Sequence, residues 1–166
     1  PTGLAVAKRV RAFGAQVIGW NRTERAVPGV RNIALDELFA EADIVSIHTA
    51  ATAETRHLVS ARRLALMKLG AVIVNTARGS VIDEAALIEA LSSGKIRAGL
   101  DVYEQEPLAQ DSPLLAMDNV VLMPHLGSAT AATRQAMMER AYANLVAGLE
   151  GKPLPWCANP EVYTTV

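Results

Sequence analysis

The chain has 166 residues, of which 51% are hydrophobic and 20% charged, a composition typical of one globular domain with a sizeable core. Its 16 basic and 17 acidic residues give a net charge of -1 at pH 7, so neither a nucleic-acid nor a membrane partner is expected. The single cysteine, Cys157, excludes an internal disulfide, and the first residues do not resemble a signal peptide, which together favour a cytoplasmic protein.

Short runs rich in β-branched residues alternate with helical patterns, and this alternation predicts an α/β domain with a doubly wound parallel sheet. The runs VIVN and VVLM are apolar at successive positions, which predicts a central sheet with helices on both faces. The expected strands occupy residues 16–20, 43–48, 71–75, 98–102 and 119–123.

Helices are predicted between these strands, the first of them over residues 3–13. Others follow Asp36, Ser60 and Asp83, residue types that cap a helix or favour its first turn. A last helix over residues 131–150 carries one apolar stripe, which predicts a surface that packs into a core. The stripe consists of Met137, Met138, Ala141, Leu145 and Leu149.

The first twenty residues, PTGLAVAKRVRAFGAQVIGW, predict a helix that starts at a glycine and leads into a strand. This pattern is typical of the second half of a dinucleotide-binding βαβ unit, in which Pro1, Thr2 and Gly3 end a G-x-G-x-x-G loop. The amides of Thr2 and Gly3 are then expected to bind pyrophosphate at the helix start. A glycine near a helix start is common, so this pattern needs support from other residues.

Asn21, Arg22 and Thr23 follow the next predicted strand, where such a fold meets the adenosine ribose. A carboxylate at this place favours NAD, whereas a neutral amide with Arg22 and Arg25 suits the 2′-phosphate of NADP. NADP is therefore the preferred cofactor and NAD the alternative. Solvated loop arginines would explain the same residues without a ligand.

Residues capable of chemistry follow three later strands. Arg78 follows the strand AVIVN, the acidic segment LDVYEQEP follows the next strand, and His125 follows VVLM. Because the carboxyl ends of parallel strands lie at one edge of a sheet, these side chains are expected to meet. Arginine can hold a carboxylate by two parallel hydrogen bonds, and a glutamate beside a histidine stabilises the imidazolium that donates a proton. His48 and His57, the latter on a polar loop, are the competing histidines.

The segments NTARGSVIDEAAL, LDVYEQEP and PHLGSAT, in this order, resemble the nucleotide-binding domain of the D-isomer-specific 2-hydroxyacid dehydrogenases. The resemblance covers nearly the whole chain and implies a Rossmann-type fold. It implies that Arg78 binds the substrate carboxylate and carbonyl, that His125 donates or accepts the proton, and that Glu106 orients the imidazole. The dinucleotide contacts that it implies are Thr2, Gly3, Asn21, Arg22, Thr23, Thr49, Thr55, Thr76, Ala77, Arg78, Asp101, His125, Gly127 and Ser128.

The resemblance also implies a division of the chain. Residues 1–150 are expected to be a dinucleotide-binding domain that lacks its first strand and first two loop glycines, and residues 151–166 a tail that returns to a substrate domain outside this sequence. Residues 1–166 alone are accordingly expected to be inactive. The family also implies a homodimer.

Within the family, the non-acidic Asn21-Arg22-Thr23 segment and the C-terminal third most resemble glyoxylate and hydroxypyruvate reductases. This implies hydride transfer between NAD(P)H and a small 2-oxo acid to give a D-2-hydroxy acid, without a metal ion. Two alternatives stay open: a dinucleotide-sensing binding module of the corepressor type, and an enzyme similar to phosphoglycerate dehydrogenase. Turnover with a panel of 2-oxo acids separates them.

Overall fold

The computed structural model of the chain describes residues 2–23 and 26–163. The chain divides into two compact units between His125 and Leu126, whereas the domain boundary expected near residue 150 stays a prediction. Pro1 and Arg25, which belong to the predicted cofactor loops, lie outside the described residues. In the described ranges, every helix is too short or too polar to cross a lipid bilayer.

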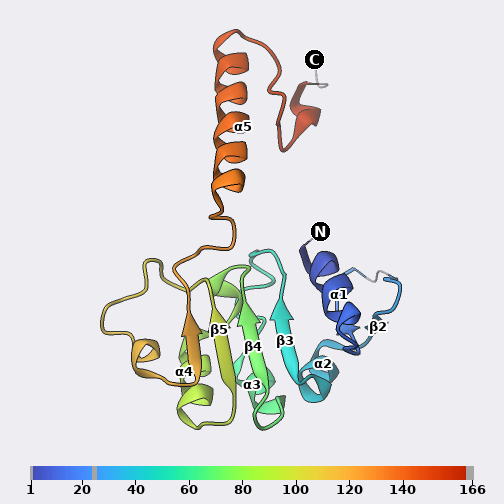
Figure 1. Cartoon of the computed structure of the whole chain (residues 1–166), viewed down its shortest axis with the longest axis vertical. Helices are drawn as coiled ribbons and strands as arrows, with labels where there is room; N and C mark the ends of the chain where they lie inside the picture. The colour runs from blue at the N-terminus through green and yellow to red at the C-terminus, as the bar shows by residue number, and fades with distance from the viewer. Residues whose placement is uncertain (1, 24–25, 164–166) are drawn as a thin grey trace. The chain divides into compact units, whose positions relative to one another are not determined.

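A four-stranded parallel sheet forms the centre of the first unit (Figure 1). Its strands, in spatial order, are β3 (Ile44–Ile47), β4 (Val72–Asn75), β5 (Arg97–Leu100) and β6 (Val120–Leu122). Asn75 pairs with Ile47 on one side and with Leu100 on the other, and Leu100 pairs with Leu122. The four strands therefore end level with one another, which confirms the predicted parallel α/β fold and places all four carboxyl ends along one edge.

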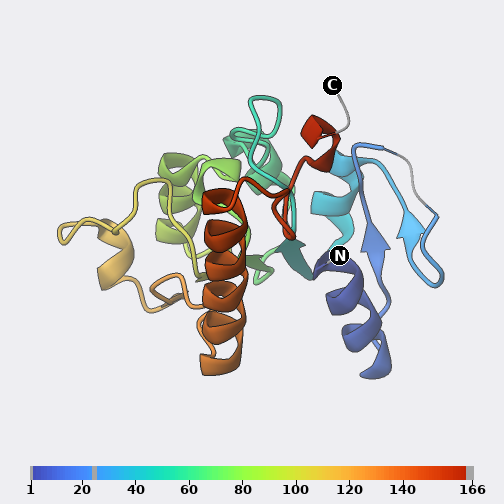
Figure 2. The ribbon, with the colours of Figure 1, turned by 90° about the horizontal axis from the view of Figure 1, so that it is seen from above.

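The first helix and two short strands lie beside β3 (Figures 1 and 2). Helix α1 (Thr2–Ala12) leads into β1 (Ile18–Gly19), which pairs in parallel with β2 (Arg31–Asn32) in a separate small sheet. The sequence analysis missed β2, because its Arg-Asn pair is exposed and has no apolar pattern.

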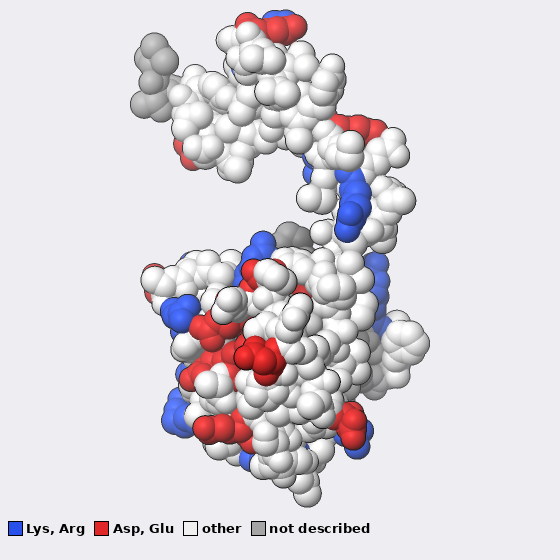
Figure 3. Space-filling view, turned by 90° about the vertical axis from the view of Figure 1, so that its left-hand side faces the viewer, with Lys and Arg blue, Asp and Glu red and all other residues white. Residues whose placement is uncertain are grey.

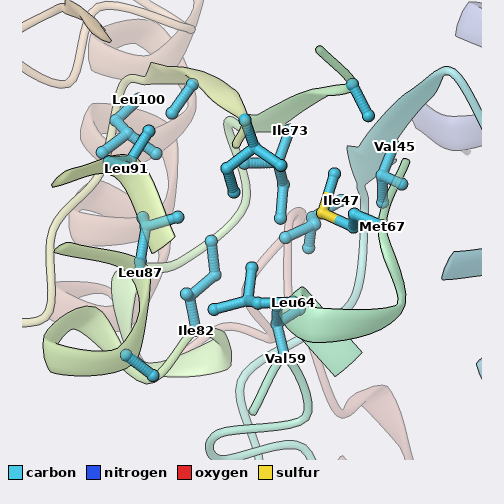
Figure 4. Packing of buried hydrophobic residues seen from close by; sticks show 14 of the residues in the cluster. Val45, Ile47, Val59, Leu64, Met67, Ile73, Ile82, Leu87, Leu91 and Leu100 are labelled. Atoms are coloured by element: carbon cyan, nitrogen blue, oxygen red, sulfur yellow. The ribbon is translucent and has the colours of Figure 1, made fainter. Parts of the chain in front are cut away.

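Helices α2 (Leu35–Glu41), α3 (Ala61–Leu66) and α4 (Glu84–Ser92) pack against the buried face of the large sheet (Figure 4). The predicted cap of α4 is confirmed, since Asp83 accepts a hydrogen bond from the N–H of Ala86 at 3.1 Å. Two short 3₁₀ turns, η1 (Gly79–Val81) and η2 (Pro113–Ala116), complete this unit. The core between helices and sheet contains Leu64, Ile73, Leu87, Leu91 and Leu100.

Within the first unit, α2, α3 and α4 bury one face of the large sheet, and the expectation that helices cover both faces stays a prediction. Residues alternate between exposed and buried along β3, and Ile44 is 67% exposed. Val121 of β6 is 66% exposed. Within this unit, the apolar runs are therefore buried on one face only, because successive side chains of a strand point to opposite faces and only one of these is covered by α2, α3 and α4.

The second unit consists of α5 (Ala131–Leu149) and a tail that ends in η3 (Pro160–Tyr163). Asn144 of α5 holds the tail through two hydrogen bonds to the backbone of Trp156, at 2.9 and 3.2 Å. The tail does not bury the apolar stripe of α5 within this unit, and the packing of the stripe into a core stays a prediction. All five stripe residues are exposed: Met137, Met138, Ala141, Leu145 and Leu149. The return of residues 151–166 to a substrate domain stays a prediction.

We expect the Ile73→Ala substitution to lower the free energy of unfolding by about 2–5 kcal/mol. The Ile73 side chain is fully buried, so its truncation leaves a cavity in the core. Urea denaturation of the chain measures this loss. The matched control is Ile44→Ala on the exposed face of β3, with an expected cost of about 0.5 kcal/mol. Equal losses in the two variants would contradict the one-sided core.

Candidate active site

The turn after β4 places Arg78 at the carboxyl edge of the sheet. Asn75, the last residue of β4, is 1% exposed, and its side-chain amide donates a hydrogen bond to the carbonyl of Arg78 at 2.9 Å. Its side-chain oxygen accepts one from the N–H of Ala77 at 3.0 Å. These two bonds fold the chain sharply after β4 and leave the side chains of Thr76 and Arg78 exposed. The sequence analysis missed this role of Asn75, although asparagine at the end of an apolar run is a turn signal.

The acidic segment after β5 lies directly on this turn. A Cβ atom added to Gly79 would come within 1.8 Å of the Tyr103 carbonyl group, so only glycine fits between the two backbones. The Tyr103 hydroxyl donates a hydrogen bond to the carbonyl of Met123 at 2.8 Å, just after β6. The residues after β4, β5 and β6 are thus held together at one edge.

Glu106 and His125 meet at this edge. The imidazole Nδ1 of His125 donates a hydrogen bond to Oε2 of Glu106 at 2.8 Å, and the N–H of Tyr103 donates to Oε1 at 3.1 Å. Both side chains are partly exposed, at 46% for His125 and 38% for Glu106. His125 has a φ of 54°, a conformation that costs a non-glycine residue energy and is often found at functional sites. The structure brings the two residues together as expected, and their catalytic roles stay a prediction.

Three neighbours favour the ionised form of Glu106. The hydrogen bond from His125 contributes most to lowering the pKa of Glu106 below its ordinary value, and the Tyr103 N–H acts in the same direction. The positive charges of His125 and Arg78 lower it further, against the opposing effect of burial. Arg78 therefore lies within electrostatic reach of Glu106. The three predicted catalytic groups share one site.

The two other histidines have different surroundings. His48 follows β3 and contacts the Ser46 hydroxyl at 3.0 Å, and burial lowers the pKa of His48. His57 is only partly exposed, and its Nε2 is 2.8 Å from Oε1 of Glu104. His57 lies in a turn of the polar loop after β3, as expected, and the distant carboxylate of Glu104 contacts it.

The start of α1 packs closely against the end of β3. A Cβ atom on Gly3 would lie 3.2 Å from the Cβ of His48, so the absence of a side chain lets the helix start pack tightly against the end of β3. Thr2 is exposed at the first position of α1. This glycine packing and the exposed amide end of the helix fit a dinucleotide pyrophosphate.

Asn21, Arg22 and Thr23 are all exposed after β1. Arg22 forms an ion pair with Glu54, from the loop after β3, at 2.6 Å, and both side chains are more than two-thirds exposed. Such an exposed pair contributes at most about 1 kcal/mol, so Arg22 can exchange Glu54 for another anion at little cost. These residues fit the adenosine end of a dinucleotide.

The remaining predicted dinucleotide contacts differ from one another in how far they are exposed. Thr49 is partly exposed, whereas Thr55 is buried and donates its hydroxyl proton to the carbonyl of Ala50 at 2.6 Å. Thr55 therefore shapes the loop after β3, and Asp101 is likewise buried, at 6% exposure. Gly127 and Ser128 belong to the second unit. All of these contacts stay predictions.

Comparisons with known proteins give a consistent result. A sequence model of the NAD-binding domain of the D-isomer specific 2-hydroxyacid dehydrogenases matches residues 1–127. Glyoxylate/hydroxypyruvate reductase B of Serratia proteamaculans is 46% identical over 166 residues, which cover 96% of this chain and 51% of that protein. The chain spans about half the length of the curated relatives that it matches first.

Solved structures agree. The TT0316 protein of Thermus thermophilus has a TM-score of 0.86 at 49% identity, over 92% of this chain and 49% of that one. A D-isomer specific 2-hydroxyacid dehydrogenase of Xanthobacter autotrophicus, in complex with NADPH and MES, has a TM-score of 0.78 at 42% identity, over 96% of this chain and 67% of that one.

The lowered pKa of Glu106 predicts how its contribution to stability depends on pH. A carboxyl group whose folded pKa is lowered stabilises the fold above its unfolded pKa, about 4.3, and loses this effect as the pH falls through the folded value. We expect Glu106→Gln to be less stable than the wild type at about pH 5.5, and the difference to shrink towards about pH 3. Urea denaturation across this range measures it. A difference that is constant or grows on acidification would contradict the assignment.

Proposed function

Because the chain belongs to the D-isomer specific 2-hydroxyacid dehydrogenases, we propose that its protein transfers a hydride between NAD(P)H and a small 2-oxo acid, giving a D-2-hydroxy acid. The observation that carries this proposal is the 2.8 Å contact between His125 and Glu106, at the edge where Arg78 ends the turn after β4. Glyoxylate and hydroxypyruvate are the proposed substrates, supported by the name of the Serratia relative.

When bound, the dinucleotide supplies the hydride that reduces the carbonyl carbon. Arg78 holds the substrate carboxylate through two parallel N–H···O bonds, which orients the carbonyl group. His125 gives a proton from Nε2 to the carbonyl oxygen, while its Nδ1 is engaged by Glu106. Glu106 stabilises the imidazolium and holds the ring in place. In the oxidation direction, the same Nε2 accepts the hydroxyl proton.

We propose that NADP is preferred over NAD. Asn21, Arg22 and Thr23 follow β1 without a carboxylate among them, and a 2′-phosphate would replace the Glu54 carboxylate as the partner of Arg22. The similar Xanthobacter enzyme was solved with NADPH, which supports the same preference.

We also propose a cytoplasmic homodimer that has no nucleic-acid partner. The single cysteine supports a reducing compartment, and the family supports the dimer. On the face shown in Figure 3, acidic side chains gather on the first unit and basic side chains are scattered around them. A nucleic-acid site requires a continuous basic surface, and this face does not provide one.

We expect His125→Asn to lower kcat for glyoxylate reduction about 10²–10⁴-fold, because the general acid is lost, and to weaken NADPH binding far less than it lowers kcat. Steady-state rates of NADPH oxidation by the full-length protein, with NADPH titration as the control, measure both effects. An undiminished kcat would refute the role of His125. A wild-type protein that binds NADPH but turns over neither glyoxylate nor hydroxypyruvate would favour the dinucleotide-sensing module.

We expect Arg22→Asp to weaken NADPH binding about 10–100-fold and to change NADH binding much less, because only NADPH carries the phosphate that Arg22 would bind. Calorimetric titration with both dinucleotides measures the preference. Arg97→Asp, at the opposite end of the sheet on β5, changes the net charge equally and is the matched control. If Arg22→Asp weakens both dinucleotides equally, the NADP assignment is wrong.

A further inference from the structure

Two histidines in the left-handed backbone region contact two glutamates of the same segment. His57 has a φ of 50° and His125 a φ of 54°, and they are the non-glycine residues with positive φ in the described parts of the chain. His57 pairs with Glu104 and His125 pairs with Glu106, each at 2.8 Å. The proposed reaction uses the pair of His125 and Glu106, and it assigns no role to the pair of His57 and Glu104.

Glu104 ties three parts of the first unit together. Its Oε1 accepts hydrogen bonds from Nη2 of Arg56 at 2.7 Å and from the His57 ring at 2.8 Å, both in the loop after β3. Its own N–H donates to Oε2 of Glu84, at the start of α4, at 2.9 Å. The side chain of Glu104 is only 28% exposed. We call this set, Arg56, His57, Glu84 and Glu104, the Glu104 clamp.

The opposite end of the clamp is also fixed. The N–H of His57 donates to the carbonyl of Ser80 at 2.9 Å, in the η1 turn that follows Arg78. Gly79 of the same turn lies against the Tyr103 backbone. The Glu104 clamp therefore holds the segment after β5 against the turn that contains Arg78.

The Glu104 clamp lies next to the backbone that carries Glu106. Tyr103 precedes Glu104 in the chain, and its N–H donates to the Glu106 carboxylate at 3.1 Å. Glu104 and Glu106 are two residues apart, so their Cα atoms are at most about 7 Å apart. A shift of about 1 Å at this segment would break both hydrogen bonds of Glu106, because such bonds tolerate only a few tenths of an ångström.

We propose that Glu104, held by Arg56 and His57, is a positioning residue for the acid–base pair of Glu106 and His125. This rests on the proposed function. Glu104 touches neither substrate nor dinucleotide in this proposal. It sets the backbone from which Glu106 reaches His125, and it does so by joining the loop after β3 to the segment after β5.

The first experiment measures kcat and KM for glyoxylate with NADPH, using the full-length protein and the variant Glu104→Ala. We expect kcat to fall about 10–100-fold with little change in the KM for glyoxylate, as for a misplaced catalytic group. Glu104→Gln keeps a hydrogen-bond acceptor but loses the negative charge. Its kcat should lie between that of Glu104→Ala and that of the wild type.

The matched control is Asp36→Asn. Asp36 is a carboxylate that also accepts hydrogen bonds from two cations, Arg62 at 2.7 Å and Arg63 at 2.8 Å, but it joins α2 to α3. This variant should leave kcat within about twofold of the wild type. If Asp36→Asn and Glu104→Ala lower the free energy of unfolding equally and also lower kcat equally, the role of Glu104 is structural and it is not a positioning residue.

A double-mutant cycle with Glu106→Gln tests whether Glu104 acts through Glu106. In that background, Glu104→Ala should lower kcat less than about twofold, because the group that it positions is already inactive. Multiplicative losses in the double variant would overturn the proposal.

A spectroscopic measurement keeps the test independent of turnover. The side-chain ¹⁵N resonances of His125 report its bond to Glu106, and Glu104→Ala should shift them while Asp36→Asn should not. If the wild type has no turnover but these resonances shift, the proposed function fails and the positioning role stands. Unchanged His125 resonances in Glu104→Ala overturn the positioning role in either case.

Discussion

The hydrogen bond between Nδ1 of His125 and Glu106 is the contact on which the site depends. It joins two side chains 19 residues apart in the chain. They meet because β5 and β6 are parallel neighbours that end level with each other, so both residues leave the sheet at the same edge. Without this register, the imidazole would lack the carboxylate that engages one ring nitrogen and leaves the other for the proposed proton transfer.

Close backbone packing keeps the residues of this edge together. Asn75 closes the turn after β4, and Gly79 lets the Tyr103 backbone lie directly on that turn. Tyr103 then bonds to the carbonyl of Met123, just ahead of His125. The positive φ of His125 costs energy, and this network of contacts supplies the constraint that maintains it.

The proposed dinucleotide half of the site is organised more loosely. Arg22 and Glu54 form an exposed ion pair that can open at little cost, whereas Thr55 uses its hydroxyl to bond within its own loop. A binding edge of this kind combines a rigid glycine-packed helix start at Gly3 with polar side chains that can change partners. This combination suits the proposed dinucleotide, which would bind and leave in every cycle of the proposed reaction.

The sequence by itself determined the alternation of helices with the strands of the large sheet, the Asp83 cap and the expectation that Arg78, Glu106 and His125 lie at one edge, whereas it missed β2. It could do so because parallel strands joined by helices bring their carboxyl ends to the same side. The family resemblance already named Glu106 as the partner of His125, but only the tertiary structure showed that Glu104 contacts His57, because side-chain directions in a loop depend on backbone angles and on distant partners. It also decided that α2, α3 and α4 bury one face of β3 while Ile44 on the other face is exposed within the first unit, since periodicity shows which residues share a face and not whether another element covers it.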